Sequence, residues 1–140
     1  PHGVAADVFG QFGAGLAADY RATVDRFLAL EAQGSDHMRQ ELRLLREQVY
    51  ARGEPAPRFL HEGLDVLDRS DLRARLPALA LPSLWIAGRR DRLVPWQAME
   101  AAAALAPDGR FARVDSGGHA PFLTHADEVA DCIIGFAAAH

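Results

Sequence analysis

The chain has 140 residues, of which 49% are hydrophobic and 24% charged, and its 15 Lys and Arg against 19 Asp and Glu give a formal net charge of −4. This length allows one domain at most, and so large a hydrophobic fraction excludes a wholly disordered chain. The acidic balance supplies no excess of cations for a phosphate backbone, so nucleic acid is not an expected partner.

The first half of the chain carries apolar residues at helical spacing and predicts three or four successive helices. One apolar stripe occupies a single face of a helix that Gly34 can end, and Ser35 can cap the helix that follows. This first stripe consists of Leu16, Tyr20, Val24, Phe27 and Leu28. The next helix carries a second stripe of Met38, Leu42, Leu45 and Val49, and a shorter amphipathic helix is expected over about residues 58–67.

The second half changes to a strand, helix, strand, helix pattern. A buried strand is expected over residues 81–87, a helix over 96–106, an edge strand over 110–115 and a closing helix over 126–139. Two strands joined by a helix predict a parallel pair. Because a parallel sheet of two strands is too small to be covered by helices on both faces, we expect further strands on a segment upstream of Pro1.

The sequence also lacks the features of membrane and metal-binding proteins. Its longest nearly apolar stretch, residues 76–88, is shorter than the roughly 18 residues that span a bilayer, and the amino end has no signal-peptide pattern. Cys132 is the only cysteine, so it cannot form an internal disulfide, and no cluster of Cys and His has the spacing of a structural zinc site. We therefore expect a protein of the reducing cytoplasm that does not associate with membranes.

Asp91 and His119 are the residues best suited to chemistry. Each follows the end of a predicted strand, and the carboxyl ends of neighbouring parallel strands lie at one edge of a sheet. A carboxylate beside an imidazole forms the acid and base of a relay in which the imidazole takes the proton of a nucleophile. Taken singly, Asp91 fits a turn or a surface ion pair and His119 a hydrogen-bonded loop residue, but their order and equivalent placement favour catalysis.

These residues carry a resemblance to a known family. Residues 88–95, GRRDRLVP, and 118–122, GHAPF, are similar to the carboxyl-terminal half of the α/β-hydrolase family, whose catalytic triad runs in the order Ser, Asp, His. Residues 23–30, 63–67, 71–73 and 119–125 resemble the carboxylesterases of biotin synthesis within that family. The resemblance implies an α/β fold in which residues 1–69 form an all-helical lid and residues 70–140 form the last two parallel strands and helices of the core.

The same resemblance implies an activity and its binding residues. The activity is that of a serine carboxylesterase that hydrolyses the methyl ester of pimeloyl-acyl-carrier protein, without a metal or an organic cofactor. The implied catalytic residues are Asp91 and His119. Lid arginines that receive the acidic carrier protein match Arg26, Arg39 and Arg43, while a fourth such position falls on Ala22, next to Arg21. Phe12 and Phe27 match aromatic positions that line the acyl tunnel of the family.

The residues themselves support part of this interpretation. Arg39, Arg43 and Arg46 project within about 60° of one another on one predicted helix and would form a basic ridge beside its apolar stripe. An ordinary solvated helix face is the alternative, because Glu47 can pair with Arg43 at i,i+4. For Phe12 and Phe27 the alternative is packing within the lid, and both roles can hold together.

The nucleophile of the relay is not found in the sequence. Its serines are Ser35, Ser70, Ser83 and Ser116, and none stands in a Gly-x-Ser-x-Gly turn. We therefore expect the chain to be inactive alone and to need the missing amino-terminal half of the same enzyme. The alternatives are another α/β hydrolase, such as an enol-lactone hydrolase or a cofactor-free haloperoxidase, and a non-catalytic interaction module.

Overall fold

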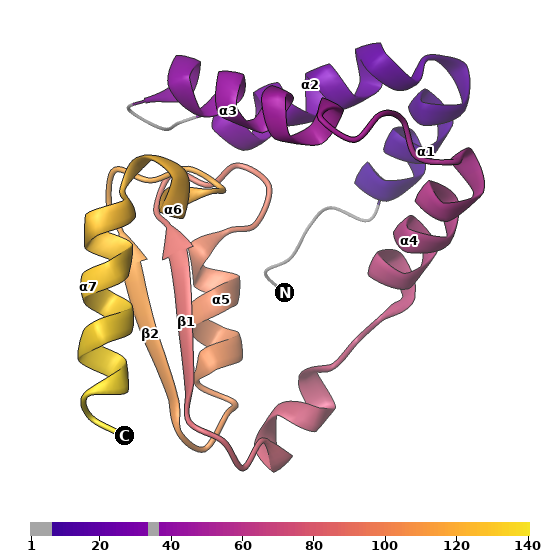
Figure 1. Ribbon diagram of the computed structural model, residues 1–140. Helices are drawn as coiled ribbons and strands as arrows, with labels where there is room; N and C mark the ends of the chain where they lie inside the picture. Colours follow the sequence, from indigo (N-terminus) through magenta and orange to yellow (C-terminus); the bar gives the residue numbers. More distant parts are fainter. Residues whose placement is uncertain (1–6, 34–36) are drawn as a thin grey trace.

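The computed structural model describes residues 7–33 and 37–140 (Figure 1). Four helices come first, α1 (Val8–Ala18), α2 (Tyr20–Ala32), α3 (Met38–Tyr50) and α4 (Pro57–Arg69). They are followed by the 3₁₀-helix η1 (Arg73–Ala78), strand β1 (Ser83–Gly88), helix α5 (Trp96–Ala103), strand β2 (Gly109–Val114), the short helix α6 (Pro121–Thr124) and helix α7 (Ala126–Ala137). The predicted order of elements is confirmed, and η1 and α6 are additions that the sequence pattern did not predict.

The predicted first helix is wrong in one respect, because its apolar stripe is divided between α1 and α2. The chain turns at Asp19, whose backbone is extended with φ −154° and ψ 99°. Its carboxylate accepts a hydrogen bond from the Ala22 N–H at 3.0 Å, and an aspartate that caps a new helix in this way ends the helix before it. The predicted helix end at Gly34 and cap at Ser35 lie outside the described residues.

The helical half nevertheless encloses one apolar core. Leu16 of α1 meets Val24 and Leu28 of α2 there, and all three side chains are buried. Side chains from α3 and α4, including Leu45 and Leu64, pack against this cluster. The break at Asp19 therefore folds α1 back so that the two halves of the predicted stripe still face one another, which is the arrangement that removes most apolar surface from water.

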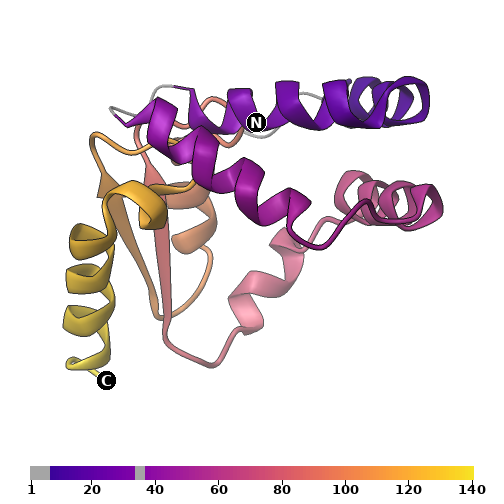
Figure 2. The same ribbon diagram turned by 45° about the horizontal axis from the view of Figure 1, so that its top comes forward.

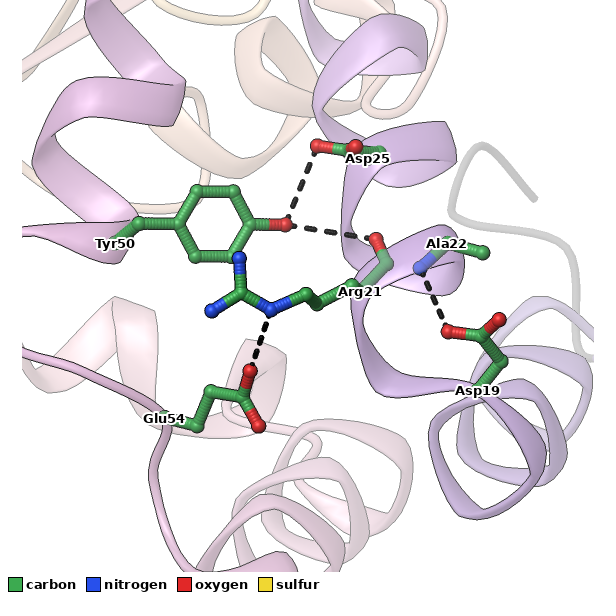
Figure 3. A network of polar contacts seen from close by, with 6 residues as sticks. All are labelled: Asp19, Arg21, Ala22, Asp25, Tyr50 and Glu54. Atoms are coloured by element: carbon green, nitrogen blue, oxygen red, sulfur yellow. Dashed lines mark hydrogen bonds and ion pairs between the residues drawn. The ribbon is translucent and has the colours of Figure 1, made fainter.

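Polar contacts join α2 to α3 and to the segment that follows α3 (Figure 3). The Tyr50 hydroxyl lies 3.2 Å from Asp25 Oδ1 and 3.5 Å from the Arg21 carbonyl oxygen. The Arg21 guanidinium donates to Glu54 at 2.7 Å and lies over the Tyr50 ring, 5.1 Å from its centre. Arg46 of α3 also donates to Asp25, at 3.0 Å. These contacts fix how α3 lies on α2.

The two strands form a small parallel sheet, as predicted. Their register runs from Ser83 opposite Gly109 to Gly88 opposite Val114. In Figure 1 the strands lie between α7 and α5, and both helices contact both strands. Both views place α2 and α3 beyond the carboxyl ends of the strands, so the loops that leave β1 and β2 emerge beneath the helical half (Figures 1 and 2). Catalytic groups of α/β proteins gather at this end of the sheet.

Several large apolar side chains of the strand-containing half are exposed. The exposed fraction is 70% for Leu81, 60% for Phe122 and 65% for Ile134. Apolar surface of this kind is typical of a contact face, and it agrees with the expectation of a larger sheet, which stays a prediction. Among residues 7–33 and 37–140, no helix has the length and hydropathy needed to cross a membrane.

Candidate active site

Asp91 lies in the turn that follows β1 and is held there by backbone donors. Its Oδ1 atom accepts hydrogen bonds from the Leu93 N–H at 2.8 Å and the Val94 N–H at 2.9 Å. An aspartate that accepts from the backbone two and three residues ahead stabilises its own turn. The second oxygen, Oδ2, is left to face outward from the turn, and only 6% of the side chain is exposed.

His119 lies in the loop after β2, which contacts the loop after β1. The Arg90 N–H donates to the Gly117 carbonyl at 3.0 Å, and the Arg89 N–H donates to the Val114 carbonyl at the end of β2 at 2.9 Å. Gly88 permits this approach, because a Cβ atom there would lie 2.5 Å from the Gly117 carbonyl oxygen and would also clash with the carbonyl oxygen of Gly118. Glycine at the end of β1 therefore allows the His119 loop to lie against the strand.

The two loops bring the predicted pair together. His119 Nδ1 lies 2.9 Å from Asp91 Oδ2, within hydrogen-bond distance. The hydrogen bond to Asp91 raises the pKa of His119 above its ordinary value, burial opposes this increase, and the negative charges of Asp91, Glu31 and Glu41 add to it. The imidazole is thus oriented by one carboxylate through Nδ1, which leaves Nε2 available for a proton transfer.

Glu31, near the carboxyl end of α2, is a site residue that the sequence analysis missed. Its Oε1 atom lies 3.9 Å from His119 Nε2, and its backbone carbonyl accepts a hydrogen bond from the His119 N–H at 3.3 Å. Burial raises the pKa of Glu31, and the charge of His119 lowers it. The sequence held one signal for Glu31. Residues four apart share a helix face, so Glu31 lies on the same apolar face of α2 as Phe27, where a carboxylate is unusual. Glu41 of α3 lies within an apolar stripe in the same way and is fully buried.

An apolar cavity opens beside His119. Its volume is about 440 Å³, which suits a small organic chain. The Phe12 and Phe27 rings form part of its wall and contact each other, with ring centres 4.8 Å apart. The remaining wall consists of Val8, Phe9, Glu31, Leu64, Leu67, Leu93, Val94 and His119. Phe12 and Phe27 thus line this cavity and contact each other within the helical half, while their role in binding an acyl chain stays a prediction.

The same two phenylalanines border a second cavity on the side of the apolar core of the helical half. This second cavity has a volume of about 420 Å³ and is lined by residues of α1, α2, α3 and α4, including Leu16, Leu28 and Leu60. Phe12 and Phe27 therefore separate the space beside His119 from the space inside the helical half.

The predicted arginines are surface residues of α2 and α3. Arg26, Arg39 and Arg43 are exposed, with Arg26 donating to the Thr23 hydroxyl at 3.0 Å and Arg43 lying 3.6 Å from Glu47. Arg46, the third member of the predicted ridge, pairs instead with Asp25 of α2. The ridge is therefore Arg39 and Arg43, because the Arg46 guanidinium is drawn toward α2.

The sequence contains no nucleophile turn, and the described residues contain no metal-binding cluster. No serine of the 140-residue sequence stands in a Gly-x-Ser-x-Gly turn. Within residues 7–33 and 37–140, no group of three or more His, Cys, Asp and Glu side chains is arranged to hold a metal ion.

Comparison with known proteins identifies relatives of the chain. A family model described as alpha/beta hydrolase fold matches residues 3–126. The pimeloyl-[acyl-carrier protein] methyl ester esterase of Xanthomonas campestris pv. campestris (strain B100) is 59% identical over 139 residues, which cover 99% of this chain and 55% of that protein. The protein of the same name from Stenotrophomonas maltophilia (strain K279a) is 56% identical over 99% of this chain and 54% of its own length. The chain thus spans about half the length of the curated relatives it matches.

Solved structures with the same fold are more distant in sequence. A bromoperoxidase from Bacillus anthracis superposes with a TM-score of 0.80 at 22% identity, over 93% of this chain and 48% of that one. The esterase EaEST from Exiguobacterium antarcticum superposes with a TM-score of 0.78 at 16% identity, over 97% of this chain and 49% of that one. At these identities the likeness shows a shared fold and nothing about activity.

Proposed function

Because the chain belongs to the α/β-hydrolase family, we propose that it supplies the lid and the acid and base of the catalytic triad in a serine carboxylesterase. The proposed substrate is the methyl ester of a pimeloyl chain carried on acyl carrier protein, as the names of the relatives at 59% and 56% identity indicate. In this proposal residues 1–69 form the lid, and residues 70–140 belong to the core.

One observation carries the proposal. The hydrogen bond of 2.9 Å between His119 Nδ1 and Asp91 Oδ2 lies beside an apolar cavity of about 440 Å³. A base oriented by a carboxylate supports acyl transfer, and an apolar cavity next to it supports an acyl chain as the bound group. Neither the hydrogen bond nor the cavity alone distinguishes an esterase from a structural contact. Their juxtaposition favours an esterase.

The proposed reaction uses His119 twice. Its Nε2 atom takes the proton of a serine hydroxyl while the serine oxygen attacks the ester carbonyl, and the same proton then passes to the departing methoxide, which leaves as methanol. A water molecule next gives its proton to His119 and attacks the acyl-serine, and the serine regains a proton as the free acid is released. Asp91 accepts the Nδ1–H hydrogen bond throughout and stabilises the imidazolium that forms at each step.

The serine and the oxyanion donors belong, in this proposal, to an amino-terminal half of the same enzyme. The exposed apolar residues of the strand-containing half, such as Leu81 and Ile134, would pack against that half. Phe12 and Phe27 would line the tunnel for the acyl chain, and Arg26, Arg39 and Arg43 would receive the acidic carrier protein. A cytoplasmic location belongs to the same proposal and agrees with a free thiol at Cys132.

The activity is tested with the complete enzyme and a pimeloyl methyl ester on acyl carrier protein, with the mass of the carrier as the measurement. We expect conversion of the methyl ester to the free acid and its loss in His119→Ala. The 140-residue chain alone should leave both this substrate and a short p-nitrophenyl ester intact. Turnover by the isolated chain that disappears in His119→Ala would contradict the assignment of the nucleophile to another segment.

The carrier-protein site needs a separate test. Arg39→Glu combined with Arg43→Glu should raise KM for the carrier-bound ester and weaken its dependence on salt, while KM for a free short ester stays unchanged. The matched control is Arg58→Glu with Arg69→Glu, which changes the charge of α4 by the same amount. Equal effects of both pairs on the carrier-bound ester would mean that general charge, and not the Arg39 and Arg43 ridge, governs binding.

The alternatives are less favoured. An enol-lactone hydrolase or a haloperoxidase would use Asp91 and His119 without the arginine ridge, and the likeness to a bromoperoxidase is limited to fold at 22% identity. A non-catalytic interaction module would need neither the Asp91 and His119 hydrogen bond nor a cavity beside it. Turnover of a free ester by the complete enzyme, without preference for the carrier-bound ester, would favour the first alternative.

A further inference from the structure

The His119 ring lies between two carboxylates from different parts of the chain. Asp91 Oδ2 lies 2.9 Å from Nδ1, and Glu31 Oε1 lies 3.9 Å from Nε2. Asp91 comes from the loop after β1, whereas Glu31 comes from α2, which lies beyond the carboxyl ends of the strands (Figure 1). The lid therefore contributes a carboxylate to the side of the ring that would exchange a proton with the nucleophile.

The backbone of Glu31 also holds His119. The Glu31 carbonyl belongs to the last turn of α2, where carbonyl groups have no partner within the helix, and the His119 N–H donates to it at 3.3 Å. The carboxyl end of a helix carries a partial negative charge, which favours a nearby cation. The main chain at the end of α2 and the Glu31 side chain thus both favour a positive charge on the His119 ring.

The distance of 3.9 Å determines the kind of interaction. It is too long for a strong hydrogen bond but short enough for an attraction between opposite charges. Because the exposed fraction is 14% for the Glu31 side chain and 31% for His119, solvent screens this attraction less than at an open surface. The carboxylates that act on His119 are Asp91 from the β1 loop, Glu31 from α2 and Glu41 from α3, and burial of the ring opposes them.

We propose that Glu31 is a positioning residue of the lid, whose carboxylate stabilises the imidazolium of His119 across the ring from Asp91. The role follows from the proposed reaction, in which His119 becomes positively charged at each proton transfer. It links the lid to the chemistry, because a displacement of α2 would remove this charge from the ring. A residue that only tethers α2 to the His119 loop would act through its backbone, and its side-chain charge would have no effect on the ring.

The experiment measures the titration of His119 by NMR in the complete protein, with imidazole signals assigned by the loss of one signal in His119→Gln. Glu31→Gln should lower the His119 pKa relative to the unaltered protein, because an opposite charge within about 4–6 Å favours the charged form. Glu31→Asp, which keeps the charge, should lower the pKa less. The control Glu62→Gln, an exposed carboxylate of α4, should leave the pKa unchanged.

A second measurement needs no variant. The carboxyl carbon signal of Glu31 in the unaltered protein should show a step at the pKa of His119, because each group senses the charge of the other. Equal His119 pKa values in folded Glu31→Gln and Glu62→Gln, or the absence of this step, would overturn the proposal. Neither the His119 titration nor the Glu31 carboxyl signal requires a substrate, so both measurements remain informative even if the complete protein hydrolyses no ester. In an active enzyme, the acidic limb of the kcat/KM profile should also move to lower pH in Glu31→Gln by the same amount.

Discussion

Gly88→Ala should damage the site through the backbone alone, without removing any catalytic group. A Cβ atom at position 88 would lie 2.5 Å from the Gly117 oxygen and 2.7 Å from its carbonyl carbon, and it would also clash with the Gly118 oxygen. Contacts of a Cβ atom under 3.0 Å are essentially never seen. Because all of these atoms belong to backbone, no side-chain rotation relieves the overlap, and the loop that carries His119 has to withdraw from β1.

The size of the effect follows from the same distances. The loop must move by at least about 0.5 Å at Gly117, and by more at Gly118, which precedes His119 in the chain. Such a shift would lengthen the 2.9 Å hydrogen bond between His119 and Asp91 to roughly 3.5 Å, beyond the range of a good hydrogen bond. A displacement of about 1 Å at a catalytic group costs on the order of 10²-fold in rate. Overpacking of this kind also lowers the free energy of unfolding by about 1–3 kcal/mol.

The assay compares turnover and thermal unfolding of the complete enzyme carrying Gly88→Ala with those of Gly63→Ala. Gly63 lies in α4 with no atom near its added Cβ, so alanine there should leave turnover unchanged and stabilise the helix by up to about 1 kcal/mol. Turnover within a factor of about two of the unaltered enzyme in Gly88→Ala would refute the claim that close contact between the two loops positions His119.

Three further predictions concern Asp91, His119 and the apolar core of the helical half. Asp91→Asn keeps an oxygen for the Leu93 and Val94 N–H groups but presents an amide NH2 to His119 Nδ1. Steady-state kinetics should show turnover about 10⁴-fold lower, and thermal unfolding should show little change in melting temperature. The raised pKa of His119 stabilises the folded state fully below its ordinary value of 6.5 and ceases to do so as pH rises through the raised pKa. The difference in urea-unfolding free energy between the unaltered protein and His119→Gln should therefore be largest below pH 6.5 and shrink as pH rises above it. Leu28→Ala, at a side chain that is 3% exposed, should lower the unfolding free energy by about 2–5 kcal/mol, whereas a loss under about 1 kcal/mol would mean that the apolar core of the helical half is not packed as described.

Element type and order could be predicted because the signals for them are local. The stripe of α3 and the strands that end at Gly88 and Val114 follow from the spacing of apolar residues within short windows. The division of the first stripe at Asp19 was also encoded locally, as an aspartate three residues before the Ala22 N–H that it caps. Apolar periodicity continued through this position and hid the break.

The candidate site could be predicted only in part. Asp91 and His119 were found because each follows a strand, and the parallel pairing of β1 and β2 brings such positions to one edge. Arg46 was grouped with Arg39 and Arg43 by helical angle, yet it pairs with Asp25, since side-chain partners depend on the neighbouring helix. Glu31 was missed for the same reason, because nothing near it in the sequence indicates that it will face an imidazole.

Local sequence patterns are sufficient to place the helices, the strands, and Asp91 and His119 after those strands, since these features depend on neighbours a few residues away. The 2.9 Å contact between Asp91 and His119, the close approach allowed by Gly88 and the placement of Glu31 beside Nε2 arise only in the folded chain. These contacts join residues far apart in the chain. Their geometry depends on how β1 and β2 pair and on where the end of α2 lies against the His119 loop. No local pattern contains that information, because it arises from burial summed over the whole fold.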